Sequence, residues 1–184
     1  IELPESVRRL SDYAFENCKN LTDIDDLLKG IEEIGDFAFT GSGVRSVNFP
    51  EGLLIIGESA FSGCEELRSF SMPSTLTNIG SRAFSSCKRL MTSTLNGSDL
   101  TINGNIFASS PFISSITIGK DVQAFNCSAL DENITELIFE EGSQCTKISG
   151  NMFNSNSSIA SIVLPPSLKE IGDYVFRKSI LPSL

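Results

Sequence analysis

The sequence predicts a single-domain α/β solenoid of about eight 23-residue coils. We expect a parallel β-sheet on its concave face, with short helical turns and loops on its convex side. Two observations lead to this expectation: a segment that repeats after 23 residues, and a phenylalanine that recurs once in each repeat. The 184 residues fit one domain, which we take to be residues 1–184 and a fragment of a longer repeat array.

The clearest repeat lies in the middle of the chain. Residues 79–90 match residues 56–67 at a spacing of 23, and both segments read Ile-Gly, then Ala-Phe, then Cys. Seven of the 13 phenylalanines fall at one repeat position, so the aromatic content has an architectural explanation. Carried outward, the period predicts a buried spine with one large apolar residue per coil: Phe15, Phe39, Phe61, Phe84, Phe107, Leu130, Phe153 and Phe176.

Each coil opens with a short strand. In Val47-Asn48-Phe49 the outer two residues should face inward and the middle one outward, because side chains alternate along a strand. A second inward apolar pair follows, as in Leu76 and Ile79. Between the two, a proline ends the strand in four coils, since it cannot continue a hydrogen-bonded ladder: Pro4, Pro50, Pro73 and Pro165.

The second half of each coil is predicted to be a turn. We expect a positive φ just after the second apolar pair, where glycine is favoured. The Ala-Phe segment that follows is predicted as one or two helical turns that insert the aromatic ring into the coil. The expected turn positions are Gly35, Gly57, Gly80 and Gly172, with Asn103 and Asn126 in two further coils.

The sixth coil departs from the pattern, because its nearest aromatic residue, Phe125, falls five residues early. Alignment of the flanking residues places Phe125 at a second core position and Leu130 in the spine. The same alignment predicts that Cys145 is buried and that Cys127 is exposed. Length changes should compensate nearby: the turn at 131–134 is two residues short, and residues 140–143 add about two.

One coil shows the whole motif, as Leu67-Arg68-Ser69-Phe70-Ser71-Met72-Pro73, Leu76-Thr77-Asn78-Ile79-Gly80 and Ala83-Phe84-Ser85-Ser86-Cys87. These residues resemble the unit of the BspA-like, treponemal-type leucine-rich repeats, and the resemblance covers nearly the whole chain, with the fifth to seventh coils less regular. It implies a leucine-rich repeat solenoid of a cell-surface or secreted protein. It also implies adhesion to host matrix proteins or other cells, without a catalytic centre.

Composition excludes several function classes. The absence of histidine removes Ser-His-Asp and Cys-His catalysis and His-ligated zinc. A net charge of −9 opposes binding to nucleic acid or to an anionic membrane surface, and no apolar run could span a bilayer. We expect no enzyme activity, no cofactor and no metal. An enzyme with paired carboxylates, such as a glycosidase, is the weakest of the remaining hypotheses, because no acids pair across the repeats.

Cysteines recur at one position, three residues after the spine residue: Cys18, Cys64 and Cys87. We predict that this position takes a small side chain that hydrogen-bonds the backbone at the coil edge. An alternative is a disulfide between Cys64 and Cys87, which lie in adjacent coils. Other coils place small polar residues at this position: Ser42, Ser110, Asn133, Asn156 and Ser179.

Acidic residues gather near the N-terminal end at Asp23, Asp25 and Asp26, with Glu32 and Glu33 nearby. The spacing lacks the pattern of a calcium loop, so we expect a solvated acidic edge. Five Asn-x-Ser/Thr sequences would be glycan candidates in a eukaryotic protein and carry little meaning in a bacterial one: Asn20, Asn96, Asn126, Asn133 and Asn156.

The outward residues of the predicted strands form the candidate site. Our leading hypothesis is a monomeric module that binds a protein partner through this sheet face. A structural spacer that presents another domain is the alternative, and Ser and Thr also simply suit exposed strands. The candidate residues are Ser46, Asn48, Ser69, Ser71, Thr92, Thr94, Ser115, Thr117, Glu136 and Ile138, with Ser161 and Val163 beyond them.

Overall fold

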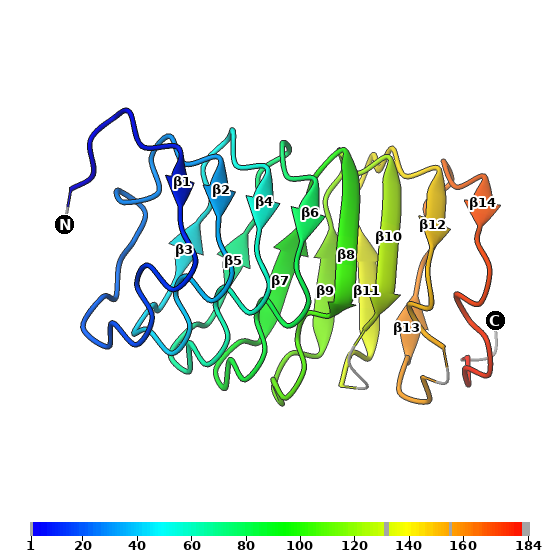
Figure 1. Ribbon diagram of the computed structural model, residues 1–184. Helices are drawn as coiled ribbons and strands as arrows, with labels where there is room; N and C mark the ends of the chain where they lie inside the picture. The colour runs from blue at the N-terminus through cyan, green and yellow to red at the C-terminus, as the bar shows by residue number, and fades with distance from the viewer. Residues whose placement is uncertain (1, 131–132, 155, 182–184) are drawn as a thin grey trace.

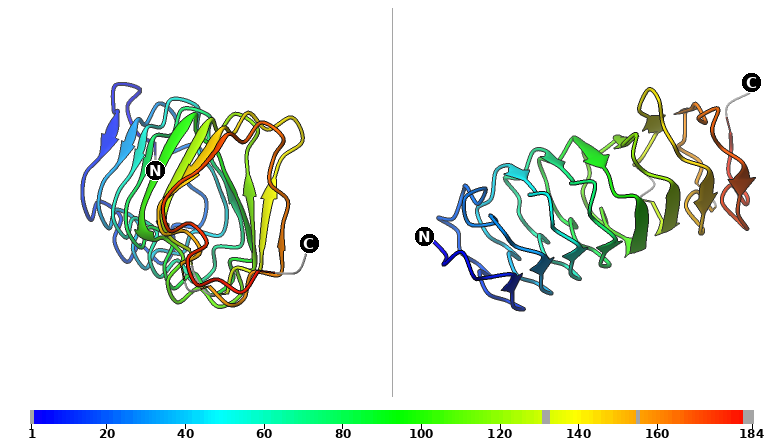
Figure 2. Two further views of the ribbon diagram at one scale, coloured as in Figure 1. Left: turned by 90° about the vertical axis from the view of Figure 1, so that its right-hand side faces the viewer. Right: turned by 90° about the horizontal axis from the view of Figure 1, so that it is seen from above.

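The computed structural model describes residues 2–130, 133–154 and 156–181. The chain winds into a solenoid whose coils stack along one axis, so that its two ends lie at opposite ends of the stack (Figure 1). Successive coils contribute parallel strands to two sheets, one of eight strands and one of six. Seen along the axis, the two sheets flank the interior of the coils (Figure 2).

The eight-stranded sheet contains β1 (Arg9–Leu10), β2 (Glu33–Ile34), β4 (Ile55–Ile56), β6 (Asn78–Ile79), β8 (Asp99–Asn105), β10 (Ala124–Ala129), β12 (Lys147–Ser149) and β14 (Glu170–Ile171). The six-stranded sheet contains β3 (Val47–Asn48), β5 (Phe70–Ser71), β7 (Thr92–Leu95), β9 (Ser115–Ile118), β11 (Glu136–Phe139) and β13 (Ser161–Ile162). Eight strands bound about seven turns, so the expected count of eight coils was too high.

The eight-stranded sheet corrects the prediction that one side of the solenoid consists of loops and helical turns. It forms from the second apolar segment of each coil: Ile56 pairs with Ile79, and Ile79 pairs with Ile102. Each pair joins residues that are one repeat apart, so each coil places the same backbone groups opposite those of its neighbour. A strict period thus satisfies backbone donors and acceptors on both sides.

The Ala-Phe turns are not helical, and no helix occurs in the described ranges. Around Phe61, the residues two before and two after have left-handed φ values, 52° at Ser59 and 69° at Gly63. The N–H groups of these three residues point to the next coil and donate to its carbonyl oxygens at 2.8–2.9 Å. Two left-handed residues in five break a right-handed helix, and hydrogen bonds between coils replace the helical ones.

The glycines after the second apolar pair do not adopt the positive φ that was expected of them. Gly35, Gly57, Gly80 and Gly172 are absent from the positive-φ residues. A Cβ at Gly80 would lie 2.3 Å from the backbone N of Glu58, and one at Gly57 would lie 2.6 Å from the carbonyl carbon of Gly35. Glycine is therefore needed because consecutive coils approach closely, whereas the positive φ falls two residues later.

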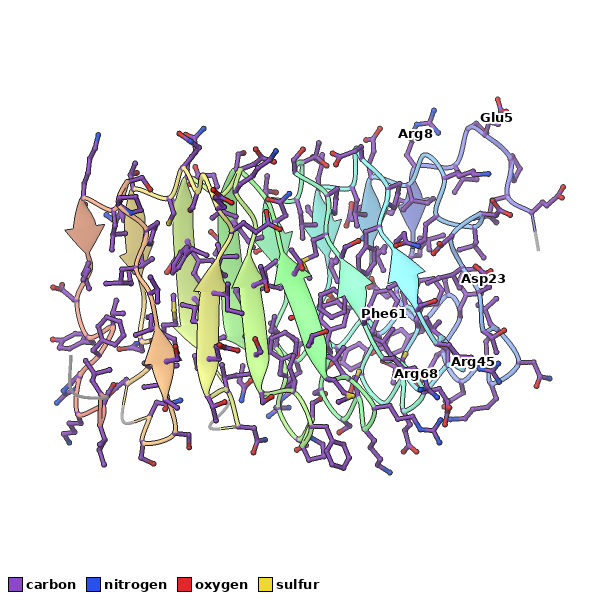
Figure 3. All side chains as sticks on the ribbon, turned by 180° about the vertical axis from the view of Figure 1, so that it is seen from behind. Glu5, Arg8, Asp23, Arg45, Phe61 and Arg68 are labelled. Atoms are coloured by element: carbon purple, nitrogen blue, oxygen red, sulfur yellow. The ribbon has the colours of Figure 1, made fainter. Side chains whose placement is uncertain are left out.

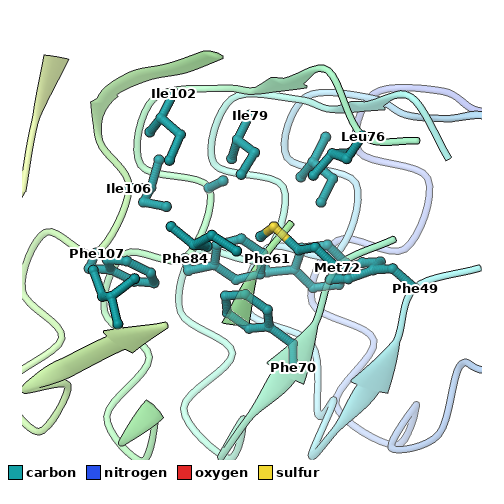
Figure 4. Packing of buried hydrophobic residues seen from close by; sticks show 14 of the residues in the cluster. Phe49, Phe61, Phe70, Met72, Leu76, Ile79, Phe84, Ile102, Ile106 and Phe107 are labelled. Atoms are coloured by element: carbon teal, nitrogen blue, oxygen red, sulfur yellow. The ribbon is translucent and has the colours of Figure 1, made fainter. Parts of the chain in front are cut away.

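The spine is confirmed as the centre of the core. Several of its rings are completely buried, among them Phe39, Phe61 and Phe84, whereas Phe15 and Phe176 in the end coils are half-buried. Ring centroids of consecutive coils lie 5.0 Å apart for Phe39 and Phe61 and 5.4 Å apart for Phe61 and Phe84, with nearly parallel planes. Figure 4 shows the rings of Phe61 and Phe84 in line across the coils, with Phe70 beside Phe84 at 4.1 Å between centroids.

Leu130 occupies the spine position of its coil, as predicted. Its N–H donates to the oxygen of Met152 at 3.1 Å, the same bond that Phe153 makes with Val175 at 2.9 Å. Phe125 is fully buried and belongs to the core, as expected.

Cys127 corrects the prediction of an exposed thiol, because it is completely buried. It lies inside β10 and pairs with Ile102 of β8, where a uniform period would place Phe125. Because β10 continues to Ala129, Cys127 lies two residues after the inward Phe125 and points to the same side of the strand. In the six-stranded sheet, Thr117 pairs with Ile138, which comes two residues earlier than a uniform period requires.

The next pair of strands restores the period, because Leu137 pairs with Ile162, two residues later than the period requires. The two slips agree with a turn that is two residues short, followed by two extra residues. Asp131 and Glu132, in the predicted short turn, lie outside the described residues.

Candidate functional site

The ten candidate residues lie on the outer face of the six-stranded sheet. Asn48, Ser71, Thr94, Thr117 and Ile138 form one column, each in register with the next. A second column runs parallel to it two residues away: Thr92, Ser115, Glu136 and Ser161. Ser46 and Ser69 directly precede β3 and β5, and all ten side chains are exposed or half-exposed. Their role in binding stays a prediction.

The chemistry of the face changes along its length. At the N-terminal end, Asp25 accepts hydrogen bonds from the backbone N–H of Asn48 at 3.0 Å and from its side-chain amide at 2.7 Å. The middle coils present small hydroxyl groups. At the C-terminal end, Ile138 and Val163 are 40% and 76% exposed, and a hollow of about 270 Å³ lies beside Val163 and Pro165. The face thus runs from acidic through hydroxylated to apolar.

Sequence reasoning missed a group of residues at one edge of this face, which we call the rim: Arg45, Arg68, Met91 and Phe112. The N–H of Arg68 donates to the oxygen of Arg45 at 3.1 Å, and the N–H of Met91 donates to the oxygen of Arg68 at 3.3 Å. Figure 3 shows the two arginines side by side. The signal was present in the sequence, because positions 45, 68 and 91 are spaced by 23 residues.

Phe112 lies in the turn before β9, whose first residue, Ser115, pairs with Thr92. Met91 directly precedes Thr92 and Ser114 directly precedes Ser115, so Ser114 continues the column of Met91. Phe112 lies two residues before Ser114, beside that column in the next coil. Met91 and Phe112 are each 64% exposed. Arginine, methionine and aromatic residues are enriched in protein interfaces, which makes this edge the best marked part of the surface.

The cysteine position binds the backbone of the preceding coil, as predicted. The Cys64 thiol donates to the oxygen of Phe39 at 3.2 Å, the Cys87 thiol to the oxygen of Phe61 at 3.4 Å, and the hydroxyl of Ser110 to the oxygen of Phe84 at 2.9 Å. All five cysteines are free, so the alternative of a Cys64–Cys87 disulfide is not found.

Burial raises the pKa of the Cys64 thiol to about 11 and raises that of Cys87 well above its usual value. Cys145 is buried, as predicted, and Cys18 is exposed. The thiolate is the reactive form of cysteine, and burial disfavours it here. The thiols of Cys64 and Cys87 therefore stay protonated and act as structural hydrogen-bond donors.

The acidic residues near the N-terminal end make contacts of their own. Asp26 pairs with Lys29 at 2.6 Å, and this pair lowers the pKa of Asp26 and raises that of Lys29. Asp23 accepts the N–H of Asp25 at 3.1 Å. Glu32 and Glu33 pair with arginines of the preceding coil at 3.6 and 3.1 Å. Within the described ranges, no three His, Cys, Asp or Glu side chains converge as metal ligands do.

The Asn-x-Ser/Thr sequences differ in accessibility. Asn20, Asn126 and Asn133 are exposed, and Asn96 is half-buried. Asn156 is only 4% exposed, and its side-chain oxygen accepts the N–H groups of Ser158 and Ile159, both at 2.8 Å. Asn156 is thus a backbone-binding residue of the coil edge.

Comparison with one solved structure shows the fold. The pneumococcal vaccine antigen PcpA matches with a TM-score of 0.59 and 22% identity, over 91% of this chain and 51% of that one. A leucine-rich repeat protein of Bacteroides ovatus and a leucine-rich cell surface protein of Faecalibacterium prausnitzii each share 18% identity at a TM-score of 0.34. The first match covers 97% of this chain and 70% of that one, and the second 96% and 69%.

The chain thus spans about half the length of the PcpA structure. No curated protein matches the chain. In the described part of the chain there is no helix that could cross a membrane.

A family model settles the relationship. The model of the BspA type leucine rich repeat region matches six copies, over residues 1–111 and 55–183. Leucine-rich repeat families of this type are generally non-enzymatic and typically bind proteins. The 23-residue period, the buried phenylalanine spine and the stacked parallel strands are the structural form of these copies, and the chain therefore belongs to the BspA-type leucine-rich repeat family.

Proposed function

We propose that this chain is a non-enzymatic, protein-binding module that acts at a cell surface or outside the cell. We further propose that it adheres to host matrix proteins or to other cells through the outer face of the six-stranded sheet. The observation that carries the proposal is the in-register array of small, exposed polar side chains from Asn48 to Thr117. Short side chains lose little conformational entropy when a broad partner covers them.

The rigidity of the face supports the same role. The outward residues Ser71, Thr94 and Thr117 lie in strands that are hydrogen-bonded to their neighbours, and the inward residues of these strands are buried. A preorganised surface loses less entropy on binding than a mobile loop does. The column extends over five consecutive strands and is not confined to a pocket, which fits a macromolecular partner.

The test places three bulky cations on the face, with the substitutions Ser71→Arg, Thr94→Arg and Thr117→Arg. A matched control places three arginines on the eight-stranded sheet, at Asn78→Arg, Thr101→Arg and Asn126→Arg, which are likewise in register. Binding of immobilised fibronectin, collagen and laminin, and of cultured host cells, is measured for each variant. We expect the face variant to lose binding and the control to keep it. Unchanged binding by the face variant would show that another surface is used.

A structural spacer is the second candidate, and the placement of the two chain ends at opposite ends of the stack favours it (Figure 1). A spacer needs only reach and stiffness. Replacing the coils with an unrelated rigid linker of equal length should therefore preserve activity if the chain is a spacer. Loss of adhesion in that chimera would support the binding module.

A further inference from the structure

We propose that the rim receives an extended, acidic segment of the protein partner, and that Arg45 and Arg68 bind its carboxylates. The inference rests on the proposed function and names the partner chemistry for one edge of the same face. It starts from an arrangement of charge that the rest of the molecule does not explain.

Charges in consecutive coils of this solenoid are mostly complementary. In five places an acidic and a basic residue of consecutive coils form an ion pair, with N···O distances of 2.6–3.6 Å. At the rim, two arginines occupy consecutive coils instead, at adjacent backbone positions. Like charges opposite one another on neighbouring strands are destabilising. At those five ion pairs, consecutive coils place an acidic side chain beside a basic one. At the rim they place two guanidinium groups in consecutive coils.

Another column of like charges, made of acidic residues, has a structural role within the protein. Asp12, Asp36 and Glu58 follow one another in consecutive coils. Asp12 accepts the N–H of Asp36 at 3.0 Å, and Asp36 accepts the N–H of Glu58 at 2.7 Å, so these carboxylates satisfy backbone donors. The two rim arginines have no comparable partner within the protein. None of the described acidic residues forms an ion pair with either of them.

Asp23 lies at the N-terminal end of the same face (Figure 3), where its carboxylate accepts the N–H of Asp25 and forms no ion pair with either arginine. The two guanidinium groups are therefore free to bind an external anion. A guanidinium group presents paired donors that match a carboxylate, and adjacent coils place the two arginines about 4.8 Å apart at the backbone. Met91 and Phe112 continue the rim with apolar surface. The matching segment thus has acidic residues followed by apolar ones.

The charge of the whole protein favours a peptide over a polyanion. The net charge is −9, and Asp25 and Glu51 lie in the coils that border the arginines. A highly sulfated glycan or a nucleic acid would bring many charges against this negative surface, whereas a peptide with two or three carboxylates needs only the two arginines.

The experiment uses a fluorescein-labelled peptide of alternating Glu and Ser with a C-terminal Leu-Phe, and a second peptide with Gln in place of each Glu. Binding is measured by fluorescence anisotropy at low and at physiological salt. The variant Arg45→Gln/Arg68→Gln is compared with Arg82→Gln/Lys169→Gln, which removes the same two charges from exposed sites elsewhere. We expect the rim variant to weaken binding of the acidic peptide at least tenfold, the control variant less than twofold, and the Gln peptide to bind as weakly as the rim variant does.

Equal binding of the acidic peptide by the rim variant and the native chain would overturn the inference. So would tighter, arginine-dependent binding of a heparin oligosaccharide, which would assign the rim to a glycan. The proposed function fails separately, if the Ser71→Arg/Thr94→Arg/Thr117→Arg variant keeps its matrix and cell binding. Because the rim substitutions remove a repulsion, we also expect an equal or higher urea midpoint, which distinguishes lost binding from lost folding.

Discussion

The N-terminal coils and the central coils hold themselves together in different ways. From β1 to β6 every strand has two residues, and the phenylalanine rings stack from coil to coil. From β7 to β11 the strands have four to seven residues. The ring of Phe107 is tilted by 32° from that of Phe84, and Leu130 replaces the next ring. Contacts between coils are made mainly by the turns in the first region and mainly by the sheets in the second.

Backbone hydrogen bonds explain the difference. In the N-terminal coils the N–H groups of the turn donate to the next coil, as those of Phe39 and Phe61 do at 2.7 and 2.8 Å. The N–H of Phe107 donates instead to the side chain of Asn105, within its own coil, at 3.0 Å. The long β8–β10 pairing supplies the contacts between coils there. A coil can therefore lose its regular turn if a longer strand compensates.

The largest expected effect tests the phenylalanine stack. Phe84→Ala should cost about 3–5 kcal/mol of unfolding free energy, because it removes a buried ring that packs against Phe61 and Phe70. Leu130→Ala should cost about 2 kcal/mol, since the spine is already interrupted there and longer strands surround it. Urea unfolding measures both. An equal or larger loss at Leu130 would contradict the division between the two regions.

The close approach of the coils is tested at Gly80. Gly80→Ala should cost up to about 3 kcal/mol, because the new Cβ would lie 2.3 Å from a backbone nitrogen of the preceding coil. Asn103, at the corresponding position of the next coil, already carries a Cβ, and Asn103→Ala should cost about 1 kcal/mol, because it removes only an exposed hydrogen bond to Asn78. Thermal unfolding compares the two variants. If Gly80→Ala is as mild as the control, crowding does not explain the glycine.

The thiols of the N-terminal coils predict a pH dependence. Burial raises the pKa of Cys64 to about 11, above its ordinary value of 9.0, so the unfolded chain loses this proton first as pH rises. Stability from this group is fully present below pH 9 and should fall by about 2 kcal/mol between pH 9 and 11. Urea midpoints under reducing conditions measure the fall. Cys64→Ser/Cys87→Ser should flatten it while keeping the fold, because Ser110 occupies the same position; an unchanged slope would place its source elsewhere.

The smallest effect concerns the binding face itself. Thr94→Ala removes an outward hydroxyl from β7 and should change the unfolding free energy by about 0.5 kcal/mol or less. Ser71→Ala, on a two-residue strand of the N-terminal region, should behave alike. Urea unfolding of both variants sharpens the comparison, since the face should be energetically uniform across two regions with different interiors. A loss near that of Phe84→Ala would contradict the assigned register.

Much of the fold could be predicted because the inward residues repeat with the chain. The regular spacing of the repeat assigned the spine, the paired columns of the six-stranded sheet and the backbone-binding position of Cys64 and Cys87. Those assignments depend on which side chain points inward, and that is a local property of a strand or turn. The family resemblance followed from the same spacing.

The errors have a common cause. The left-handed turns, the need for glycine at Gly80 and the burial of Cys127 all depend on how one coil meets the next. The repeat pattern predicts a helix in the Ala-Phe segment only if hydrogen bonds form within a coil. It predicts an exposed Cys127 only if the period is uniform. The pairing of β8 with β10 departs from the uniform period by two residues.

The sequence by itself determined the repeat, its core residues and the face that the outward residues share, because side-chain polarity along the chain encodes which positions avoid water. Only the tertiary structure decided that the solenoid has a second sheet, that its turns contain left-handed residues and that Arg45 and Arg68 have no acidic partner among the described residues. These features depend on the distance and the register between coils. Backbone hydrogen bonds and close contacts determine that distance and register, and side-chain polarity does not.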